Sequence, residues 1–158
     1  MRIGIDASKA FVAEPTGTER YSFELITRLV NLPEAREHEW IVYARNLTFS
    51  NYHLTFNSQI SQFIKLIEQM PNVKLVNIAL PYLWTQIGLA GRTWVDGLEV
   101  LWVPAHTLPL LRRGFGGHSW LKTVVTIHGI EYEWLPEYEN WLQRWYLPLS
   151  TQYAVRNT

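Results

Sequence analysis

The sequence predicts an α/β domain built on a doubly wound parallel sheet, and three observations lead to this prediction. Short apolar runs alternate with longer helical patterns along the chain, as in parallel sheets whose strands are joined by helices. The run Thr123–Ile127 has no polar alternation, which indicates a strand buried on both faces. Hydrophobic residues make up 47% of the 158 residues, enough for one core of ordinary size. We therefore expect a single domain over residues 1–158.

In the N-terminal part, apolar runs predict strands at Arg2–Asp6, Trp40–Tyr43 and Val73–Ile78. The segment Glu19–Val30 carries apolar residues at three- and four-residue spacing, which predicts a helix with one buried face. That face is expected to contain Tyr21, Leu25, Ile26, Leu29 and Val30. Thr18 is the expected N-cap, because its hydroxyl can accept a hydrogen bond from a first-turn amide.

Three segments lie between these strands. Pro33–Glu39 is a charged turn, and Arg45–Ser58 is expected to be a polar loop with room for a short strand near His53. Gln59–Met70 has apolar residues at positions i, i+3, i+4 and i+7, which predicts an amphipathic helix.

The C-terminal part continues the alternation. Tyr82–Ala90 is expected to be a helix, and Val100–Val103 is expected to be a strand. Leu108–Ser119 carries glycines and arginines and is expected to be a mobile loop. The fifth strand, Thr123–Ile127, is entirely β-branched and should be buried on both faces. Glu137–Arg156 is expected to be a closing helix rich in Trp and Tyr.

Gly17, His106 and His128 each follow a predicted strand. Because the carboxyl ends of parallel strands meet at one edge, these residues should converge on one crevice. The glycine-containing loop before the first helix forms a generic anion site, since free amides and the helix dipole favour a phosphate. It lacks the Gly-Lys-Ser/Thr ending of a Walker loop. The alternatives are that Gly17 only turns the chain and that His128 is an ordinary hydrogen-bonded loop residue.

Composition excludes several classes. With 14 basic and 14 acidic residues the formal net charge is zero, which argues against nucleic-acid binding and a strongly cationic membrane surface. There is no cysteine, so disulfides and thiolate metal sites are excluded. Only two aspartates, Asp6 and Asp96, occur, so no Asp-x-Asp pair can hold a divalent metal. The chain begins as a strand, not a signal peptide, and no apolar run reaches the ~20 residues of a membrane helix, so we expect a cytoplasmic protein.

Four segments in order, MRIGIDA, PTGTERYSFELITRL, LWVPAHTLPL and TVVTIHGIEYEWLPEY, resemble the N-terminal half of a retaining, nucleotide-sugar-dependent glycosyltransferase. The family is the large fourth one, with many mannosyl- and glucosyltransferases. The resemblance spans nearly the whole chain and implies a Rossmann-like fold, one half of a two-domain GT-B architecture. It also implies transfer of a hexose from a nucleoside diphosphate sugar to a glycan or lipid-linked acceptor, without a metal cofactor.

Site roles also follow from the resemblance. Gly17 and Thr18 match the glycine loop that approaches the donor diphosphate, and Arg20 matches a basic residue near the cleft. His128 matches the catalytic-site histidine that contacts the transferred sugar, and His106 matches a position that commonly faces the acceptor. The chain departs from the usual pattern at two positions. Glu19 stands where many relatives have a second glycine, and Gly129 stands where many have an aspartate.

The second, nucleotide-binding domain of that family is absent from these residues. Glu131 and Glu139 have the Glu-x7-Glu spacing of its characteristic pair, but Pro136 lies between them and no nucleotide-binding β-α unit surrounds them, so we interpret the spacing as coincidence. We therefore expect an isolated acceptor-side domain that is inactive alone, either part of a longer chain or the product of a split gene.

Two alternatives are kept open. The chain could instead be a non-catalytic carbohydrate- or nucleotide-binding module; a flavodoxin-like binding protein is disfavoured, because no loop is rich in Ser, Thr and Gly. Trp141, Trp145 and Tyr146 could be ordinary core. They could also form a docking surface for a second domain or for a lipid-linked acceptor at the inner face of the membrane.

Overall fold

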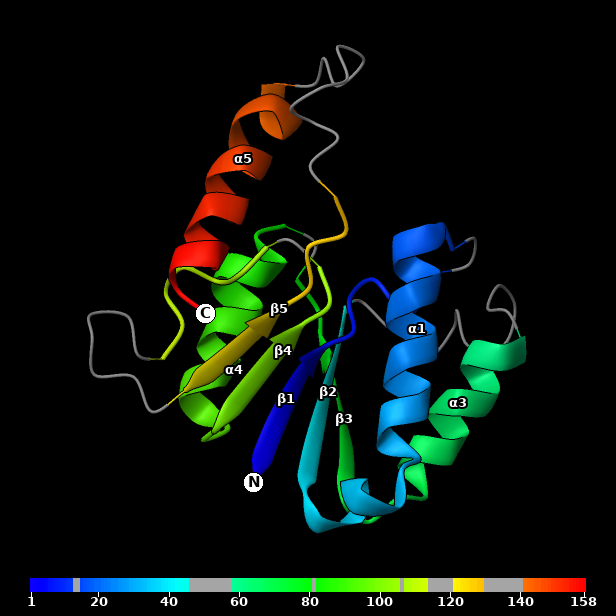
Figure 1. Cartoon of the computed structure of the whole chain (residues 1–158). Helices are drawn as coiled ribbons and strands as arrows, with labels where there is room; N and C mark the ends of the chain where they lie inside the picture. Colours follow the sequence, from blue (N-terminus) through cyan, green and yellow to red (C-terminus); the bar gives the residue numbers. More distant parts are fainter. Residues whose placement is uncertain (13–14, 46–57, 81, 106, 114–120, 130–140) are drawn as a thin grey trace.

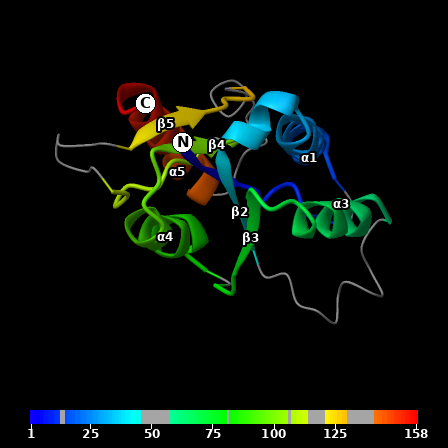
Figure 2. The ribbon, with the colours of Figure 1, turned by 90° about the horizontal axis from the view of Figure 1, so that it is seen from below.

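In the computed structural model, the chain forms a five-stranded, all-parallel sheet with helices on both faces (Figures 1 and 2). The structure describes residues 1–12, 15–45, 58–80, 82–105, 107–113, 121–129 and 141–158. The strands are β1 (Arg2–Asp6), β2 (Glu39–Arg45), β3 (Val73–Ile78), β4 (Val100–Val103) and β5 (Lys122–Val125). Their order across the sheet is β3-β2-β1-β4-β5. The α/β class predicted from the sequence is therefore confirmed.

The helical segments of the described residues connect or follow these strands. They are α1 (Gly17–Val30), the 3₁₀-helix η1 (Pro33–Glu37), α3 (Ser58–Glu68), the π-helix η2 (Trp84–Leu89), α4 (Ala90–Val95) and α5 (Trp141–Arg156). Figure 1 shows α1 and α3 on one side of the sheet and α4 and α5 on the other. The helix predicted at Tyr82–Ala90 thus starts later and runs on to Val95.

Two apolar clusters fill the spaces between the sheet and these helices. Alternate residues of a strand point to opposite faces, so β2 contributes Trp40, Val42 and Ala44 to one cluster and Ile41 and Tyr43 to the other. The first cluster also receives buried side chains of α1 and α3, and the second receives side chains of η2 and α5. The sheet is therefore covered on both faces, as the uniformly apolar central strands predict.

Two further details of the sequence prediction are wrong. The fifth strand is not buried on both faces: β5 is an edge strand, and Val124 is 51% exposed. Its β-branched composition indicates that the segment favours a strand, but it does not indicate whether that strand lies at the edge or at the centre of the sheet. The N-cap of α1 is Thr16 and not Thr18, so the helix begins at Gly17. Most of the loop predicted at Arg45–Ser58, including His53, lies outside the described residues, as do residues 114–119 of the loop predicted at Leu108–Ser119.

Candidate functional site

The candidate site lies at the carboxyl edge of the sheet, beside β1 and β4. Strand order runs one way from β1 to β2 and β3 and the other way from β1 to β4 and β5. In open α/β sheets, ligands bind at such a reversal, in the crevice outside the carboxyl ends of the strands. The segments that follow β1, β4 and β5 therefore border the expected binding crevice.

The carbonyl oxygen of Pro104, directly after β4, joins two of these segments. The His128 Nε2 atom lies 3.0 Å from it. The Ser22 hydroxyl of α1 lies 3.3 Å from the same oxygen and 2.8 Å from the carbonyl of Thr18. The side chain of Pro104 is fully buried, so this carbonyl is a fixed point of the site.

The ring of His128 also packs directly against α1. It meets the ring of Tyr21 edge to face, with centroids 4.8 Å apart and planes at 84°. Gly17 lies one helical turn before Tyr21 on the same helix. The structure therefore places His128 against the second turn of α1, one turn from Gly17. His106, the third predicted member, lies outside the described residues, as do Glu131 and Glu139.

The contact with Pro104 fixes the protonation of one nitrogen of His128. A carbonyl oxygen can only accept, so Nε2 must carry a proton and donate it. In this arrangement Nε2 cannot act as a general base. The ring is instead held in one orientation by a hydrogen bond on one side and an aromatic contact on the other, which suits a residue that positions a ligand.

The N-terminus of α1 already carries a carboxylate. Thr16 and Glu19 form a capping box, in which the Glu19 carboxylate accepts a 3.0 Å hydrogen bond from the Thr16 amide and a second bond from the Thr16 hydroxyl. These bonds lower the pKa of Glu19, and Lys9, 3.9 Å away, adds to the effect. A phosphate at this helix end would therefore meet a resident negative charge beside the free amides of Gly17 and Thr18.

Gly17 itself leaves space for a ligand. A Cβ atom added to Gly17 would meet no atom within 4 Å, and the residue is exposed. Packing therefore does not require glycine here. A ligand approaching the backbone at this position would use the same open space.

Arg20 points to a different part of the surface. It lines a small hollow of about 50 Å³ together with Pro15, Phe23 and Ile60. This hollow lies between the start of α1, the segment after β1 and the start of α3. The structure therefore does not gather Arg20 with His128 around Pro104.

Asp6 is a candidate that sequence reasoning did not select. It ends β1 at the same edge, is 4% exposed and accepts a 2.9 Å hydrogen bond from the Ser8 amide. Burial raises the pKa of Asp6, while the bonds from Ser8 and the charge of Lys9 oppose this rise. A carboxyl group at the end of a central strand is a recognisable signal, because strand ends in such sheets line the binding crevice.

Two further site residues were missed or misassigned. Tyr21 was predicted on the buried face of its helix, but it is 40% exposed and contacts His128. Ser22, by contrast, is fully buried. Spacing alone could not separate these neighbours. The Thr16-x-x-Glu19 pattern was an available signal for the helix start, but it does not determine which side of the helix faces the sheet.

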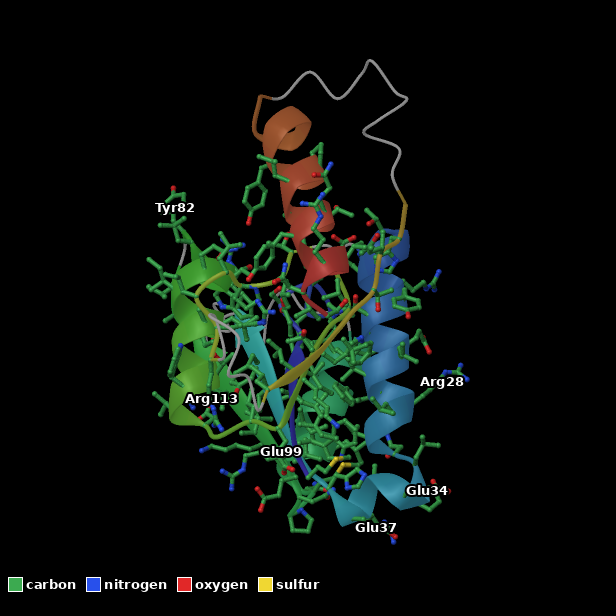
Figure 3. The ribbon with its side chains drawn as sticks, turned by 60° about the vertical axis from the view of Figure 1, so that its left-hand side comes forward. Arg28, Glu34, Glu37, Tyr82, Glu99 and Arg113 are labelled. Atoms are coloured by element: carbon green, nitrogen blue, oxygen red, sulfur yellow. The ribbon has the colours of Figure 1, made fainter. Side chains whose placement is uncertain are left out.

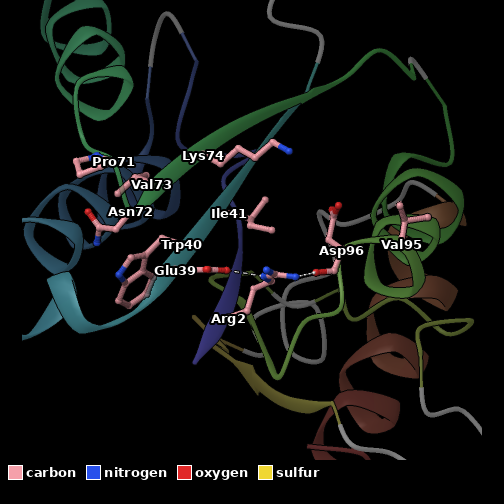
Figure 4. Close-up of a pocket in the computed structure, with 10 residues that line it drawn as sticks. All are labelled: Arg2, Glu39, Trp40, Ile41, Pro71, Asn72, Val73, Lys74, Val95 and Asp96. Atoms are coloured by element: carbon pink, nitrogen blue, oxygen red, sulfur yellow. Dashed lines mark hydrogen bonds and ion pairs between the residues drawn. The ribbon is translucent and has the colours of Figure 1, made fainter.

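A larger cavity, of about 350 Å³, lies at the opposite, amino edge of the sheet (Figure 4). Arg2 is bonded there to Glu39 at 2.7 Å and to the carbonyl oxygen of Asp96 at 3.0 Å. The Asp96 carboxylate accepts from the Tyr43 hydroxyl, and burial together with this bond raises the pKa of Tyr43. No residue predicted for the site lines this cavity, and its polar groups largely satisfy one another.

The described residues offer neither a metal cluster nor a membrane span. Over the part of the chain that the structure describes, no group of three or more His, Cys, Asp and Glu side chains is arranged to hold a metal ion. None of the described helices has the length and apolar character required to cross a bilayer. Comparisons of the chain with protein-family models, curated proteins and solved structures find no match.

Proposed function

We propose that this chain is the acceptor-side domain of a retaining glycosyltransferase of GT-B architecture. Its parallel sheet would be one doubly wound, Rossmann-like half of that enzyme. The reaction would move a hexose, mannose or glucose, from a nucleoside diphosphate sugar to a glycan or a lipid-linked acceptor. The observation that carries the proposal is the meeting of α1, the Pro104 carbonyl and His128 at the strand-order reversal, together with the sequence resemblance.

The proposed reaction is a substitution on one face of the sugar ring. The acceptor hydroxyl oxygen forms a bond to the anomeric carbon while the bond from that carbon to the diphosphate oxygen breaks. The hydroxyl proton passes to the departing diphosphate, so no protein base is required. Negative charge grows on the diphosphate, and preorganised amide donors at the start of α1 would stabilise it.

Within this scheme, His128 would orient the sugar. Its Nε2 proton is committed to Pro104, so this nitrogen would hold the ring in position and would not act as a base. Glu19 would have to release the Thr16 amide, or the diphosphate would have to bind only the amides of Gly17 and Thr18. Arg20 and His106 would serve the acceptor, Arg20 from the hollow that it lines.

The carboxylate of Glu19 favours one competing function. The Glu19 carboxylate occupies the N-terminus of α1, where a diphosphate would otherwise bind. The carboxyl edge of the sheet could therefore bind sugar hydroxyls without a diphosphate, as a non-catalytic carbohydrate-binding module would. The two functions differ in whether a donor is turned over.

The test uses the longest natural protein that contains this chain. We expect His128→Ala to reduce sugar transfer about 10²-fold, because a misplaced sugar loses near-attack geometry, with little change in the unfolding midpoint. His38→Ala, at the amino edge of the sheet, is the matched control and should retain activity. Full activity in His128→Ala would exclude the positioning role. No turnover of any common nucleotide sugar by the unaltered protein would favour the binding module.

A second variant probes the donor loop. Gly17→Ala fills open space, so the fold should tolerate it. If the donor diphosphate approaches this backbone, the added methyl group should raise the donor KM while leaving stability unchanged. An unchanged donor KM would remove Gly17 from the proposed diphosphate site.

A further inference from the structure

One side of the molecule exposes apolar side chains that the fold does not cover. This side, which we call the α4–α5 surface, is formed by η2, α4, the segment 107–113 and α5. Its large exposed side chains are Leu83 (64%), Ile87 (57%), Trp94 (59%), Leu110 (41%), Leu111 (63%), Tyr146 (37%) and Leu149 (63%). Contiguous exposed apolar patches are rare on monomeric proteins and mark sites of interaction.

Hydrogen bonds show that these elements are adjacent. Trp94 donates its indole N–H to the Leu111 carbonyl at 2.9 Å. Gln86 accepts from the Leu110 amide at 2.8 Å, and its side-chain nitrogen lies 3.2 Å from the Tyr146 hydroxyl. The segment 107–113 is thus held between η2–α4 and α5. These bonds place the exposed apolar side chains on neighbouring elements of one side of the molecule.

The helical segment η2–α4 is apolar on its outer side as well as its inner side. Trp84, Leu89 and Ala90 are buried against the sheet, whereas Leu83, Ile87 and Trp94 face outward. In Figure 3, Tyr82 lies just before this segment, and Arg113 of the segment 107–113 lies near its other end, where the Arg113 amide donates a 2.9 Å hydrogen bond to the Thr93 hydroxyl. A surface helix normally places polar residues on its outer face. Folding of this domain therefore gives no reason for the outer apolar side chains.

The backbone of this segment is also unusual. Leu83 has a φ of 52°, and it is the only non-glycine residue with a positive φ among the described residues. The π-helix η2 follows it directly. Left-handed non-glycine residues and π-helical turns both cluster at functional sites, where the strain is retained for another purpose.

The charge of this surface has one sign. Residues 79–95, 107–113 and 146–158 contain no Asp or Glu, but they contain Arg92, Arg112, Arg113 and Arg156. Asp96 follows directly, but its side chain is 10% exposed and is paired with Arg92 at 2.8 Å. Arg112 is buried. Within these described ranges the surface offers the side chains of Arg113 and Arg156 and no exposed carboxylate, although the total charge of the chain is neutral.

We propose that the α4–α5 surface docks the protein on a membrane containing anionic lipids. Aromatic and aliphatic side chains would enter the interfacial layer, and Arg113 and Arg156 would approach lipid phosphates. The polar atom of Trp94 is already bonded within the protein, so its ring presents an apolar edge outward. This binding is peripheral and does not depend on the proposed transferase activity.

Lipid fits this surface better than a protein partner. The exposed groups are large, apolar and cationic, while Gln86 and the Trp94 indole N–H direct their hydrogen bonds inward. A specific protein interface would use directional polar groups at its rim. An interfacial membrane contact requires only apolar area and positive charge.

The experiment measures sedimentation of the chain with phosphatidylcholine vesicles, with and without phosphatidylglycerol. We expect the chain to bind only vesicles that contain phosphatidylglycerol, and increasingly as its fraction rises. The double variant Ile87→Glu/Leu111→Glu should weaken binding at least about tenfold, because two exposed apolar side chains are lost to the interface. Leu32→Glu/Leu66→Glu is the matched control, with residues 47% and 40% exposed elsewhere on the molecule. This control should bind like the unaltered chain.

Arg113→Gln and Arg156→Gln test the electrostatic part, and each should weaken binding to anionic vesicles about fivefold. Circular dichroism verifies that every variant is folded. The proposal is overturned if the unaltered chain stays in the supernatant, or if Ile87→Glu/Leu111→Glu binds as well as the control. It is also overturned if the unaltered chain self-associates in ultracentrifugation and only this double variant is monomeric. That result would identify the surface as a protein interface.

Discussion

The helix α1 and the segment η2–α4 cover opposite faces of the same sheet, and they differ in what they show to the outside. Both bury apolar side chains inward, Ile26 and Val30 from α1 and Leu89 and Ala90 from η2–α4. On its outer side α1 carries charged residues, including the ion pair of Glu24 and Arg28 at 3.6 Å. The outer side of η2–α4 carries Ile87 and Trp94.

This difference distinguishes the apolar residues that folding requires from those that it does not require. Inward apolar residues are needed for the sheet to be covered, and both helical segments supply them. Outward apolar residues are not needed for folding, so their presence on one face only indicates a use outside the domain. Substitutions at inner and outer positions can establish whether this distinction holds.

The largest effects are expected at the inner positions. Ile26→Ala and Leu89→Ala each remove a fully buried side chain and should each lower the free energy of unfolding by about 2–5 kcal/mol. Their outer counterparts, Glu24→Gln and Ile87→Gln, should change it by no more than about 0.5 kcal/mol. Urea denaturation measures all four. A cost for Ile87→Gln as large as that for Leu89→Ala would mean that the outer face belongs to the core.

Two glycines of η2–α4 provide the next comparison. A Cβ on Gly88 would come within 2.7 Å of the Ile78 side chain in β3, whereas a Cβ on Gly91 would meet nothing within 4 Å. Gly88→Ala should therefore destabilise the protein by about 1–3 kcal/mol through overpacking. Gly91→Ala should stabilise it by about 0.5–1 kcal/mol, because alanine favours helix. Thermal unfolding of both variants should shift in opposite directions, and shifts of the same sign would contradict the packing described.

Leu83, the strained residue before η2, and Ile87 within η2 should change the stability of the protein in opposite directions when each is replaced by glycine. Leu83 has a φ of 52°, where glycine is favoured, so Leu83→Gly should stabilise the protein by up to about 1 kcal/mol. Ile87→Gly, inside the helical segment and similarly exposed, should destabilise it by about 1 kcal/mol. Chemical denaturation compares the two. If both variants lose stability equally, Leu83 is not under strain.

The smallest change in stability is expected for substitutions at the N-terminus of α1. Glu19 has a pKa below its ordinary value in the folded state, so its stabilising contribution is present above the unfolded pKa and is lost as the pH falls through the folded pKa. Glu19→Gln should remove about 0.3–1 kcal/mol at pH 7 and flatten the acid limb of the stability profile, which urea denaturation at a series of pH values measures.

Thr16→Ala is the partner variant for Glu19→Gln. It removes the hydroxyl that bonds to the Glu19 carboxylate, so it should reduce the effect of Glu19→Gln in a double-mutant cycle. Purely additive effects of the two changes would show that the capping box does not operate in solution.

The strands and the class of the fold could be predicted from the amino-acid sequence. β1, β3 and β4 were predicted with their observed bounds, because short, mainly apolar runs between helical patterns are typical of strands in a parallel sheet. The convergence of α1 and His128 on one edge also followed from topology, since parallel strands send all their carboxyl ends to the same side. Neither result required knowledge of a tertiary contact.

Which residues of each element lie on the outside depends on the tertiary structure. β5 looks like a central strand in sequence, but it lies at an edge, and local propensity cannot distinguish the two positions. Tyr21 and Ser22 exchange their expected burial because of where α1 starts and what packs against it. The apolar outer face of η2–α4 looks like core in sequence, because an apolar pattern records side-chain chemistry and not what covers it. Coverage depends on neighbours distant in sequence, which only the folded chain brings together.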